Sequence, residues 1–282
     1  MKKPIPPIGE FDVFRNLESW DPKQARYYIN ALNQRAKAPD QIALRANILK
    51  QSKLKPEETV LEIGCGAGQL LSALALATGP SGHVFGLEPQ PFFVKEAEHN
   101  VSNQKSAATA RVLKGFAENI PLPSASVDIC VAQTVLIHIQ PDLLPKVFAE
   151  VKRVLKPGGR FISVDQDGDT WIIDHPQREI TRKVIKFNSD YRYADGWTGR
   201  NLKRLFKQNG FEDVHIQTWT HIDTERDSYL GEMAHRIAQS AVEHNAISKS
   251  EGAKWLNELD QRASEGDLFS SICYFCCIGK KL

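Results

Sequence analysis

The chain has 282 residues, of which 41% are hydrophobic and 25% are charged, and its formal net charge is +2. This length can bury a large hydrophobic core and predicts one large domain with additional helices. So small a net charge gives no sign of a polyanionic partner, and the basic residues between positions 178 and 207, Arg192 among them, are interpreted as solvated helix faces.

No apolar run reaches the roughly 18 residues of a membrane span, and the N-terminal sequence lacks the apolar core of a signal peptide. We therefore expect a cytoplasmic protein with no membrane partner. The five cysteines fit a reducing compartment. Cys276 and Cys277 lack a second cysteine or histidine pair at zinc spacing, so no metal is expected. The sequence carries no signal for the oligomeric state.

Residues 1–20 are expected to form an irregular arm, and apolar periodicity predicts two helices after it, over Pro22–Lys37 and 41–51. Asp40 is the expected N-cap of the second helix. Residues 1–55 are thus predicted to cover a ligand site on the core, 56–282. Tyr28, on the first helix, is a candidate substrate contact, with packing against the core as the alternative.

A β-branched, apolar run at Thr59–Ile63 leads directly into Gly64, Gly66 and Gly68, and the next segment, Gln69–Thr78, is apolar at helical spacing. This order predicts a buried parallel strand, a tight turn and a helix, which together bind cofactors in many α/β proteins. The dinucleotide fingerprint G-x-G-x-x-G fits poorly, because its third glycine position is a glutamine here.

A second strand is predicted over 83–87, and Glu88 follows it about 20 residues after the glycines. An acid at this point typically accepts hydrogen bonds from ribose hydroxyls. The carboxylate also argues against a cofactor with a 2′-phosphate.

From residue 56 strands and helices alternate, a pattern that predicts a parallel sheet with helices on both faces. The other predicted strands are 111–113, Val127–Gln133, 160–164, 214–219 and 268–278. The other predicted helices are 91–103, 141–155 and Thr198–Gln208, the last with Gly210 as its C-terminal cap.

Two segments lie outside this alternation, residues 170–197 and 222–266. Insertions at the strand ends of an α/β sheet commonly form the substrate pocket. The second segment is predicted to be a mobile helical cover. The candidate substrate contacts in the two segments are Trp171, Tyr193, Trp197, Tyr229 and Met233.

Three motifs in this order resemble those of class I S-adenosylmethionine-dependent methyltransferases, especially the small-molecule enzymes related to the ubiquinone and menaquinone C-methylases. Glu62-x-Gly64-x-Gly66-x-Gly68 resembles their first motif, 115–121 resembles the loop that borders the adenine, and 153–159 resembles the turn before the fifth strand. The resemblance extends from about residue 40 to the end. It implies an α/β, Rossmann-like, doubly wound sheet of seven strands, mostly parallel, with an antiparallel last strand and extra helices as cover.

The resemblance also implies roles for single residues. Glu62 neighbours the methionine end of the cofactor, Gly64 and Gly66 lie beneath it, and Glu88 binds the ribose. The complete set of implied cofactor-binding residues is Glu62, Gly64, Cys65, Gly66, Gln69, Glu88, Pro89, Gln90, Phe116, Ala117, Glu118 and Gln133.

The position of Phe116 departs from the family, because many relatives carry an acid there that binds the adenine amine. In this chain the adenine amine is expected to donate its hydrogen bond either to Glu118 or to the backbone. Phe116 either stacks on the purine or packs in the core.

S-adenosylmethionine carries an activated methyl group, so the enzyme mainly aligns an O, N or C atom of the acceptor with the sulfonium and excludes water. His138 and Asp165 are the candidate bases, with Asp167 and His221 as further ones. The pattern Asp165-x-Asp167-x-Asp169 lacks the glycine and the glutamate of a calcium loop. It is interpreted either as a binder of polar substrate groups or as a cap of the next turn.

The predicted function is methyl transfer to a small molecule, which includes secondary metabolites. RNA methylation is one alternative, although the sequence argues against nucleic acid: Gln133-Thr134-Val135-Leu136 replaces the Asn/Asp-Pro-Pro-aromatic motif of base amino methylases. A S-adenosylmethionine-binding protein without catalysis is the other alternative. Oxidoreduction with NAD is disfavoured by the glycine spacing.

Overall fold

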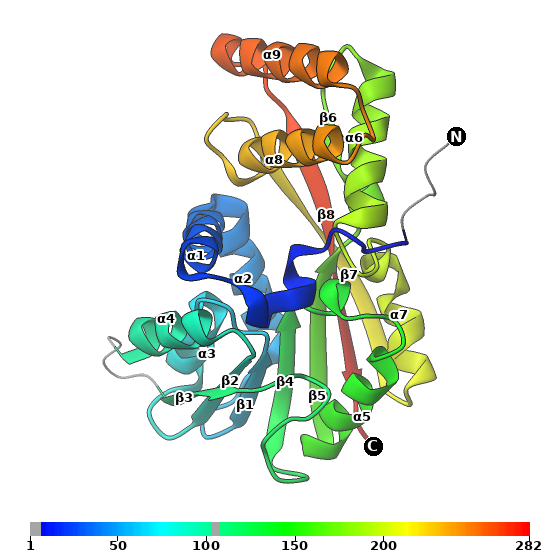
Figure 1. Ribbon diagram of the computed structural model, residues 1–282. Coiled ribbons are helices and arrows are strands. Elements are labelled where there is room, and N and C mark those ends of the chain that lie inside the picture. Colours follow the sequence, from blue (N-terminus) through cyan, green and yellow to red (C-terminus); the bar gives the residue numbers. More distant parts are fainter. Residues whose placement is uncertain (1–6, 103–107) are drawn as a thin grey trace.

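The computed structural model describes residues 7–102 and 108–282, which form an α/β fold around one mixed sheet (Figure 1). In chain order the strands are β1 (Thr59–Ile63), β2 (His83–Glu88), β3 (Thr109–Lys114), β4 (Val127–Gln133), β5 (Leu155–Gln166), β6 (Ile172–Ile173), β7 (Glu212–Asp223) and β8 (Ser270–Lys280). The strand order is β3-β2-β1-β4-β5-β8-β6, and β7 also pairs with β8. Strands β1 to β5 are parallel and β8 is antiparallel to β5 and β7, which confirms the predicted doubly wound sheet.

The sheet separates two hydrophobic cores, as expected for parallel strands buried on both faces. Alternate residues of β1 supply both cores: Val60 packs with α2 (Pro39–Ser52), α3 (Gln69–Thr78) and α4 (Pro91–Ser102). Leu61 packs on the other side with α5 (Leu144–Val154) and α7 (Thr198–Gln208). The first of these cores continues beyond the carboxyl edge of the parallel strands into α6 (Arg178–Tyr191), α8 (Tyr229–Glu243) and α9 (Lys249–Glu265).

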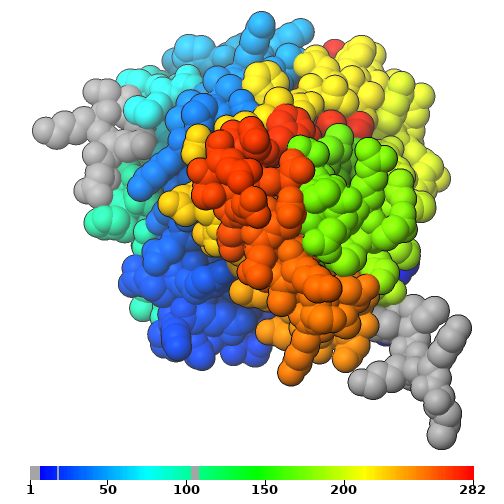
Figure 2. Space-filling view, turned by 90° about the horizontal axis from the view of Figure 1, so that it is seen from above, coloured from blue at the N-terminus to red at the C-terminus, as the bar shows by residue number. Residues whose placement is uncertain are grey.

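Further elements gather over this carboxyl edge (Figure 1). They are the 3-10 helix η1 (Val13–Ser19), α1 (Pro22–Lys37), α6, α8 and α9. Seen from above, α6, α8 and α9 form one continuous surface over this end of the molecule (Figure 2). The sheet therefore has a roof made from segments outside the strand–helix alternation.

Several predicted elements are confirmed residue for residue, among them β1, β4, α1, α3 and α7. The start of α2 was predicted wrongly. This helix begins at Pro39, whose fixed φ suits the first helical turn, and Ala38 is its N-cap. The Asp40 carboxylate instead accepts a hydrogen bond from the Ile222 amide at 2.7 Å.

The predicted arm contains regular structure, because Val13–Ser19 forms η1 with Asp12 as its N-cap. The predicted helix over 141–155 begins only at Leu144, with a proline in its first turn. The two-residue strand β6 was not predicted and extends the sheet beyond the expected seven strands. Residues 1–6 of the arm, and Asn103 at the end of the helix predicted over 91–103, lie outside the described residues.

Candidate active site

A cavity of about 340 Å³ lies between the carboxyl edge of the sheet and its roof. Its floor comes from the ends of β1, β2 and β4 and from the loop after β3. Its walls come from η1, α1, α8 and the end of α6. The topology therefore brings together residues from nearly the whole chain, at the edge where open α/β sheets bind ligands.

The glycine turn after β1 forms one part of the floor. Gly64 and Gly66 line the cavity with φ angles of +64° and +54°, in the left-handed region that favours glycine. A Cβ atom added to Gly64 would lie 2.6 Å from a methyl carbon of Val135. The turn thus exposes backbone to the cavity at a place where a side chain has no room.

Glu88 ends β2 beside this turn and is only 4% exposed. Its carboxylate accepts hydrogen bonds from the Gly66 amide at 2.9 Å and the Gln90 amide at 3.0 Å. Burial nevertheless raises the pKa of Glu88 to about 7, although these two amides lower it in part. A ligand hydroxyl that donates to this carboxylate would relieve the cost of the buried charge.

Glu62 lies on β1, 3% exposed, and its Oε2 atom has no hydrogen-bond partner among the described residues. Burial raises the pKa of Glu62 well above its usual range, and the neighbouring Glu88 raises it further. A native protein rarely leaves such an atom unpaired. Glu62 itself does not line the cavity, and its neighbours Ile63 and Gly64 do, so this oxygen lies directly behind the floor.

The loop after β3 closes the same part of the cavity. Phe116, Ala117 and Glu118 line it together with Pro89, and the Phe116 ring is 41% exposed. An aromatic face that is this exposed can stack on a planar ring. Gln133, the last residue of β4, also lines the cavity, between this loop and η2 (Leu136–His138).

His138 faces the cavity and is held from behind by the N-terminal arm. Its Nδ1 atom lies 3.0 Å from each carboxylate oxygen of Asp12. Asp12 is itself fixed, because it accepts hydrogen bonds from the Phe14 and Ala194 amides at 2.9 and 3.1 Å. The Nε2 atom of His138 has no hydrogen-bond partner among the described residues. The imidazole is therefore oriented at one nitrogen and available at the other.

Four of the six candidate substrate contacts line the cavity: Tyr28 of α1, Tyr193 after α6, and Tyr229 and Met233 of α8. The other two do not. Trp171 is buried in the core, where its ring nitrogen donates to Ser270 at 2.9 Å. The Trp171 side chain therefore packs in the core and does not form part of the cavity wall.

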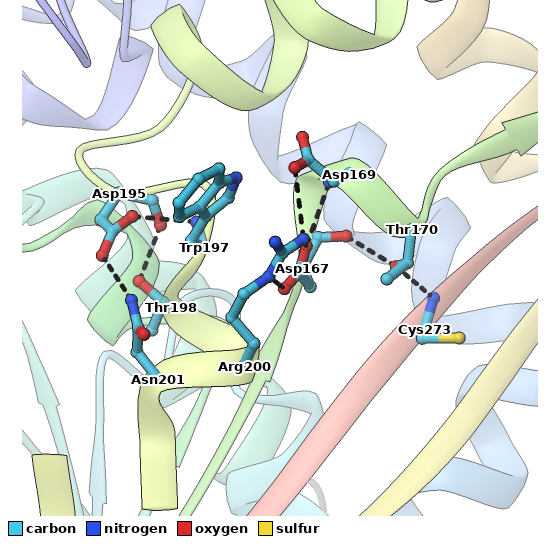
Figure 3. Close-up of polar contacts among 9 residues, drawn as sticks. All are labelled: Asp167, Asp169, Thr170, Asp195, Trp197, Thr198, Arg200, Asn201 and Cys273. Carbon is cyan, nitrogen blue, oxygen red and sulfur yellow. Dashed lines mark hydrogen bonds and ion pairs between the residues drawn. The ribbon is translucent and has the colours of Figure 1, made fainter. Parts of the chain in front are cut away.

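Trp197 is 48% exposed and lies outside the cavity. Figure 3 shows it beside Arg200. Its ring stacks under the guanidinium of Arg200, at 4.7 Å from the ring centroid. Arg200 in turn pairs with the carboxylates of Asp167 and Asp169. Asp167 also caps the next turn by accepting from the Asp169 amide, so this aspartate cluster is a capping and ion-pair network.

Asp165 lies beneath the site rather than in it. Its side chain is fully buried, does not line the cavity, and accepts hydrogen bonds from the Ile137 amide and the Ser163 hydroxyl at 3.2 and 2.9 Å. Burial raises the pKa of Asp165 to about 6. Its contacts hold the turn that carries His138. His221 is also buried, and pairs with Asp223 at 2.9 Å.

Four of the implied cofactor residues do not line the cavity: Glu62, Cys65, Gln69 and Gln90. The Gln69 amide donates to Asn33 of α1. The Gln90 amide donates to the Leu17 carbonyl of η1 at 2.9 Å and so ties the arm to the end of β2. Cys65 packs against Gly86 of β2.

The residues present fit S-adenosylmethionine as a ligand. The fit rests on the unpaired Oε2 atom of Glu62, on the bare backbone at Gly64 and Gly66, and on the buried Glu88 carboxylate. A phosphate-bearing cofactor fits less well, because this floor carries two buried carboxylates. Among the described residues, no group of three His, Cys, Asp or Glu side chains is arranged to hold a metal ion.

Sequence reasoning missed Asp12, which holds His138 from behind, and several residues that line the cavity. The sequence around Asp12 can indicate only a helix cap, which it is for η1. Its pairing with His138 could not be predicted, because the two residues are 126 positions apart in the chain. The cavity is also lined by Arg35, Arg192 and Arg236, from α1, the end of α6 and α8. The sequence alone predicts that each of these arginines faces the solvent. They come together only because the fold places their three segments around one cavity.

Comparisons with known proteins agree with this geometry. The family model described as "Methyltransferase domain" matches residues 61–163. The chain is 28% identical over 286 residues to an uncharacterized 37.1 kDa protein in transposon TN4556 of Streptomyces fradiae, an alignment that covers 98% of this chain and 80% of that one. It is 27% identical over 190 residues to demethylmenaquinone methyltransferase of Geobacillus sp. (strain WCH70), covering 62% of this chain and 80% of the relative.

Among solved structures, the cyclopropane synthase MmaA2 from Mycobacterium tuberculosis superposes on this chain with a TM-score of 0.58. The two are 17% identical, and the match covers 95% of this chain and 97% of that one. At this identity the match shows a shared fold. Within residues 7–102 and 108–282, none of the helices combines the length and the apolar character needed to cross a membrane. The motifs, the topology and the relatives agree: residues 61–163 match a methyltransferase domain, and together they support an enzyme of the class I S-adenosylmethionine-dependent type that is similar to the quinone C-methylases.

Proposed function

We propose that this enzyme transfers a methyl group from S-adenosylmethionine to a small molecule bound under α6 and α8. The observation that carries the proposal is the single cavity that joins the glycine turn and Glu88 to His138 and to the aromatic wall of Tyr193 and Tyr229. A donor and an acceptor held in one such cavity can react in line.

The cofactor supplies an electrophilic methyl group on a sulfonium. On the protein side, the backbone at Gly64 and Gly66 allows close approach, and Glu88 accepts hydrogen bonds from hydroxyl groups. The unpaired oxygen of Glu62 is suited to an ammonium group. Phe116 and Glu118 are suited to stack on a planar base and to accept from its amine.

We assign His138 as the general base for acceptors that must lose a proton. Asp12 fixes the imidazole through Nδ1, which leaves Nε2 as the nitrogen that removes a proton from an acceptor hydroxyl, thiol or amine group. The carboxylate also stabilises the imidazolium that then forms. Phe14 and Tyr193 flank the ring at centroid distances of 4.5 and 5.6 Å, which restricts both its motion and the access of water.

The proposal is tested by two measurements on the purified enzyme. Calorimetry should detect binding of S-adenosylhomocysteine, and a panel of small phenols, thiols, quinols and amines should then support its formation from S-adenosylmethionine. Binding without turnover across the panel would favour a non-catalytic binding protein. Turnover with RNA alone would refute the small-molecule acceptor.

A further inference from the structure

We propose that the acceptor carries an anionic group, a carboxylate or a phosphate, that binds between Arg35, Arg192 and Arg236. This inference rests on the proposed function and deepens it, because it assigns a chemical class to the acceptor. It does not follow from the reaction itself, since methyl transfer places no requirement on the charge of the acceptor.

The three guanidinium groups come from three separate segments that the fold brings to one cavity. Arg35 lies near the end of α1, Arg192 is the C-cap of α6, and Arg236 lies in the middle of α8. All three line the cavity and are only partly exposed. Burial raises the pKa of Tyr28, and the positive charges of Arg192 and Arg236 lower it in part, so this hydroxyl lies near both guanidinium groups.

None of these three arginines has a carboxylate within 4.0 Å among the described residues. Seven other arginines form such ion pairs, namely Arg15, Arg153, Arg160, Arg182, Arg200, Arg226 and Arg262. Of the remaining five, which have no ion pair among the described residues, Arg26, Arg111, Arg178 and Arg204 are exposed to water and Arg45 is partly buried. Charged groups taken partly out of water are normally paired, because desolvation is costly. Three unpaired cations in one cavity wall therefore indicate that the counter-charge comes with a ligand.

The contacts that these arginines do make are to neutral groups. Arg35 donates to Gln41 at 3.2 Å and to Thr134 at 2.8 Å, and its guanidinium lies 5.3 Å from the Tyr229 ring centroid. Arg192 donates to the Ser240 hydroxyl at 3.5 Å. These neutral contacts orient the two side chains but leave their charge uncompensated.

Arg236 shows most directly that a partner is missing. Its Nε atom is buried and has no hydrogen-bond partner among the described residues. Buried donors in native proteins are almost always satisfied, so this atom is available to a ligand oxygen. The planar guanidinium matches the two oxygens of a carboxylate or phosphate and binds them through paired hydrogen bonds.

The acidic residues that line the cavity do not compete for this place. They are Glu88, from the end of β2, and Glu118, from the loop after β3, whereas α1, α6 and α8 contribute no acidic residue to the lining. Met233 and Ile237 of α8 add apolar surface to this wall, and Thr134, Gln166 and Asn188 add neutral polar groups. The acceptor that fits is thus a molecule with an apolar body and an anionic group.

The test measures equilibrium binding of three probes to protein saturated with S-adenosylhomocysteine, so that the cofactor site is filled. The probes are benzoate, phenyl phosphate and benzamide, which share a ring and differ in charge. At least one anion should bind about tenfold or more tightly than benzamide, and added salt should weaken the anion alone. Whichever anion binds more tightly identifies the group as a carboxylate or a phosphate.

Variants connect the binding to the arginines. Arg236→Gln and Arg192→Gln should each weaken anion binding about tenfold, leave benzamide unchanged, and leave the affinity for S-adenosylhomocysteine unchanged. Arg236→Lys keeps the charge and should retain part of the affinity. Arg26→Gln, an exposed arginine of α1 outside this cavity, is the matched control and should have no effect.

The inference is overturned if benzamide binds as tightly as both anions, if neither anion binds at millimolar concentrations, or if the arginine variants bind the anions like the native protein. Failure of the proposed function has a different signature, because the protein would then fail to bind S-adenosylhomocysteine in the first titration. A protein that binds S-adenosylhomocysteine and methylates only neutral acceptors would keep the proposed function and refute this inference alone.

Discussion

Glu88 predicts a measurable link between cofactor binding and pH. Burial raises the pKa of this carboxyl to about 7 in the free protein, against an ordinary value near 4.5. The folded state therefore binds more protons than the unfolded state between these pH values, and the free energy of unfolding falls as the pH rises through this window. A difference of about 2.5 pH units corresponds to about 3 kcal/mol at its full extent.

A ribose hydroxyl that donates to the Glu88 carboxylate favours its charged form. Binding of S-adenosylhomocysteine below pH 7 should therefore release a proton, and the affinity should rise with pH by up to about a hundredfold between pH 5 and pH 8. Calorimetric titrations over this range, in buffers of different ionisation enthalpy, measure both the affinity and the number of protons released.

Two variants test whether Glu88 is the group that causes this pH dependence. Glu88→Gln should flatten the pH dependence and weaken binding at pH 8 about tenfold or more, because it removes charge-assisted hydrogen bonds. Glu98→Gln removes an exposed charge from α4 and should behave like the native protein. Native affinity that does not vary with pH, or an unchanged pH dependence in Glu88→Gln, would refute the assignment of Glu88 to the ribose.

Four further substitutions test other parts of the site. Gly66→Val should abolish S-adenosylhomocysteine binding with an unchanged circular dichroism spectrum, whereas Gly79→Ala, which also has positive φ but open space around it, should bind normally. His138→Ala and Asp12→Asn should each lower kcat about a hundredfold while the cofactor affinity stays within about twofold; an equal loss of affinity would contradict a proton-transfer role. Asp165→Ala should lower the free energy of unfolding by about 3 kcal/mol in chemical denaturation, because it leaves two buried donors unpaired, and a neutral effect would exclude the supporting role.

The cofactor half of the site was largely predictable from local sequence. An apolar run that meets closely spaced glycines has few structural solutions, so β1, the turn after it and α3 were located to the residue. Glu88 follows from the same unit, because parallel neighbours end at the same edge of the sheet. Side-chain direction was not predictable: Gln69, one residue past the turn, points to Asn33 on α1 instead of into the cavity.

The acceptor half was predictable only as a region. Segments 170–197 and 222–266 do contribute cavity residues, but their aromatic content did not separate Tyr193, which lines the cavity, from Trp171, which is buried in the core. Only part of the predicted helical cover over 222–266 reaches the cavity: α8 lines it, whereas α9 packs outside it. Its mobility remains a prediction.

The division between the two halves has a consequence for the choice of acceptor. The segment shared with the methyltransferase family, residues 61–163, contains the glycine turn, Glu88 and His138. Arg35, Arg192 and Arg236 all lie outside it, on the helices that form the roof of the cavity. The glycine turn, Glu88 and the proposed base His138 thus lie in the shared segment, whereas Asp12, which orients His138, and the proposed anion site lie outside it. Relatives that share the sheet but differ in these helices are therefore expected to use the same cofactor on acceptors of different charge.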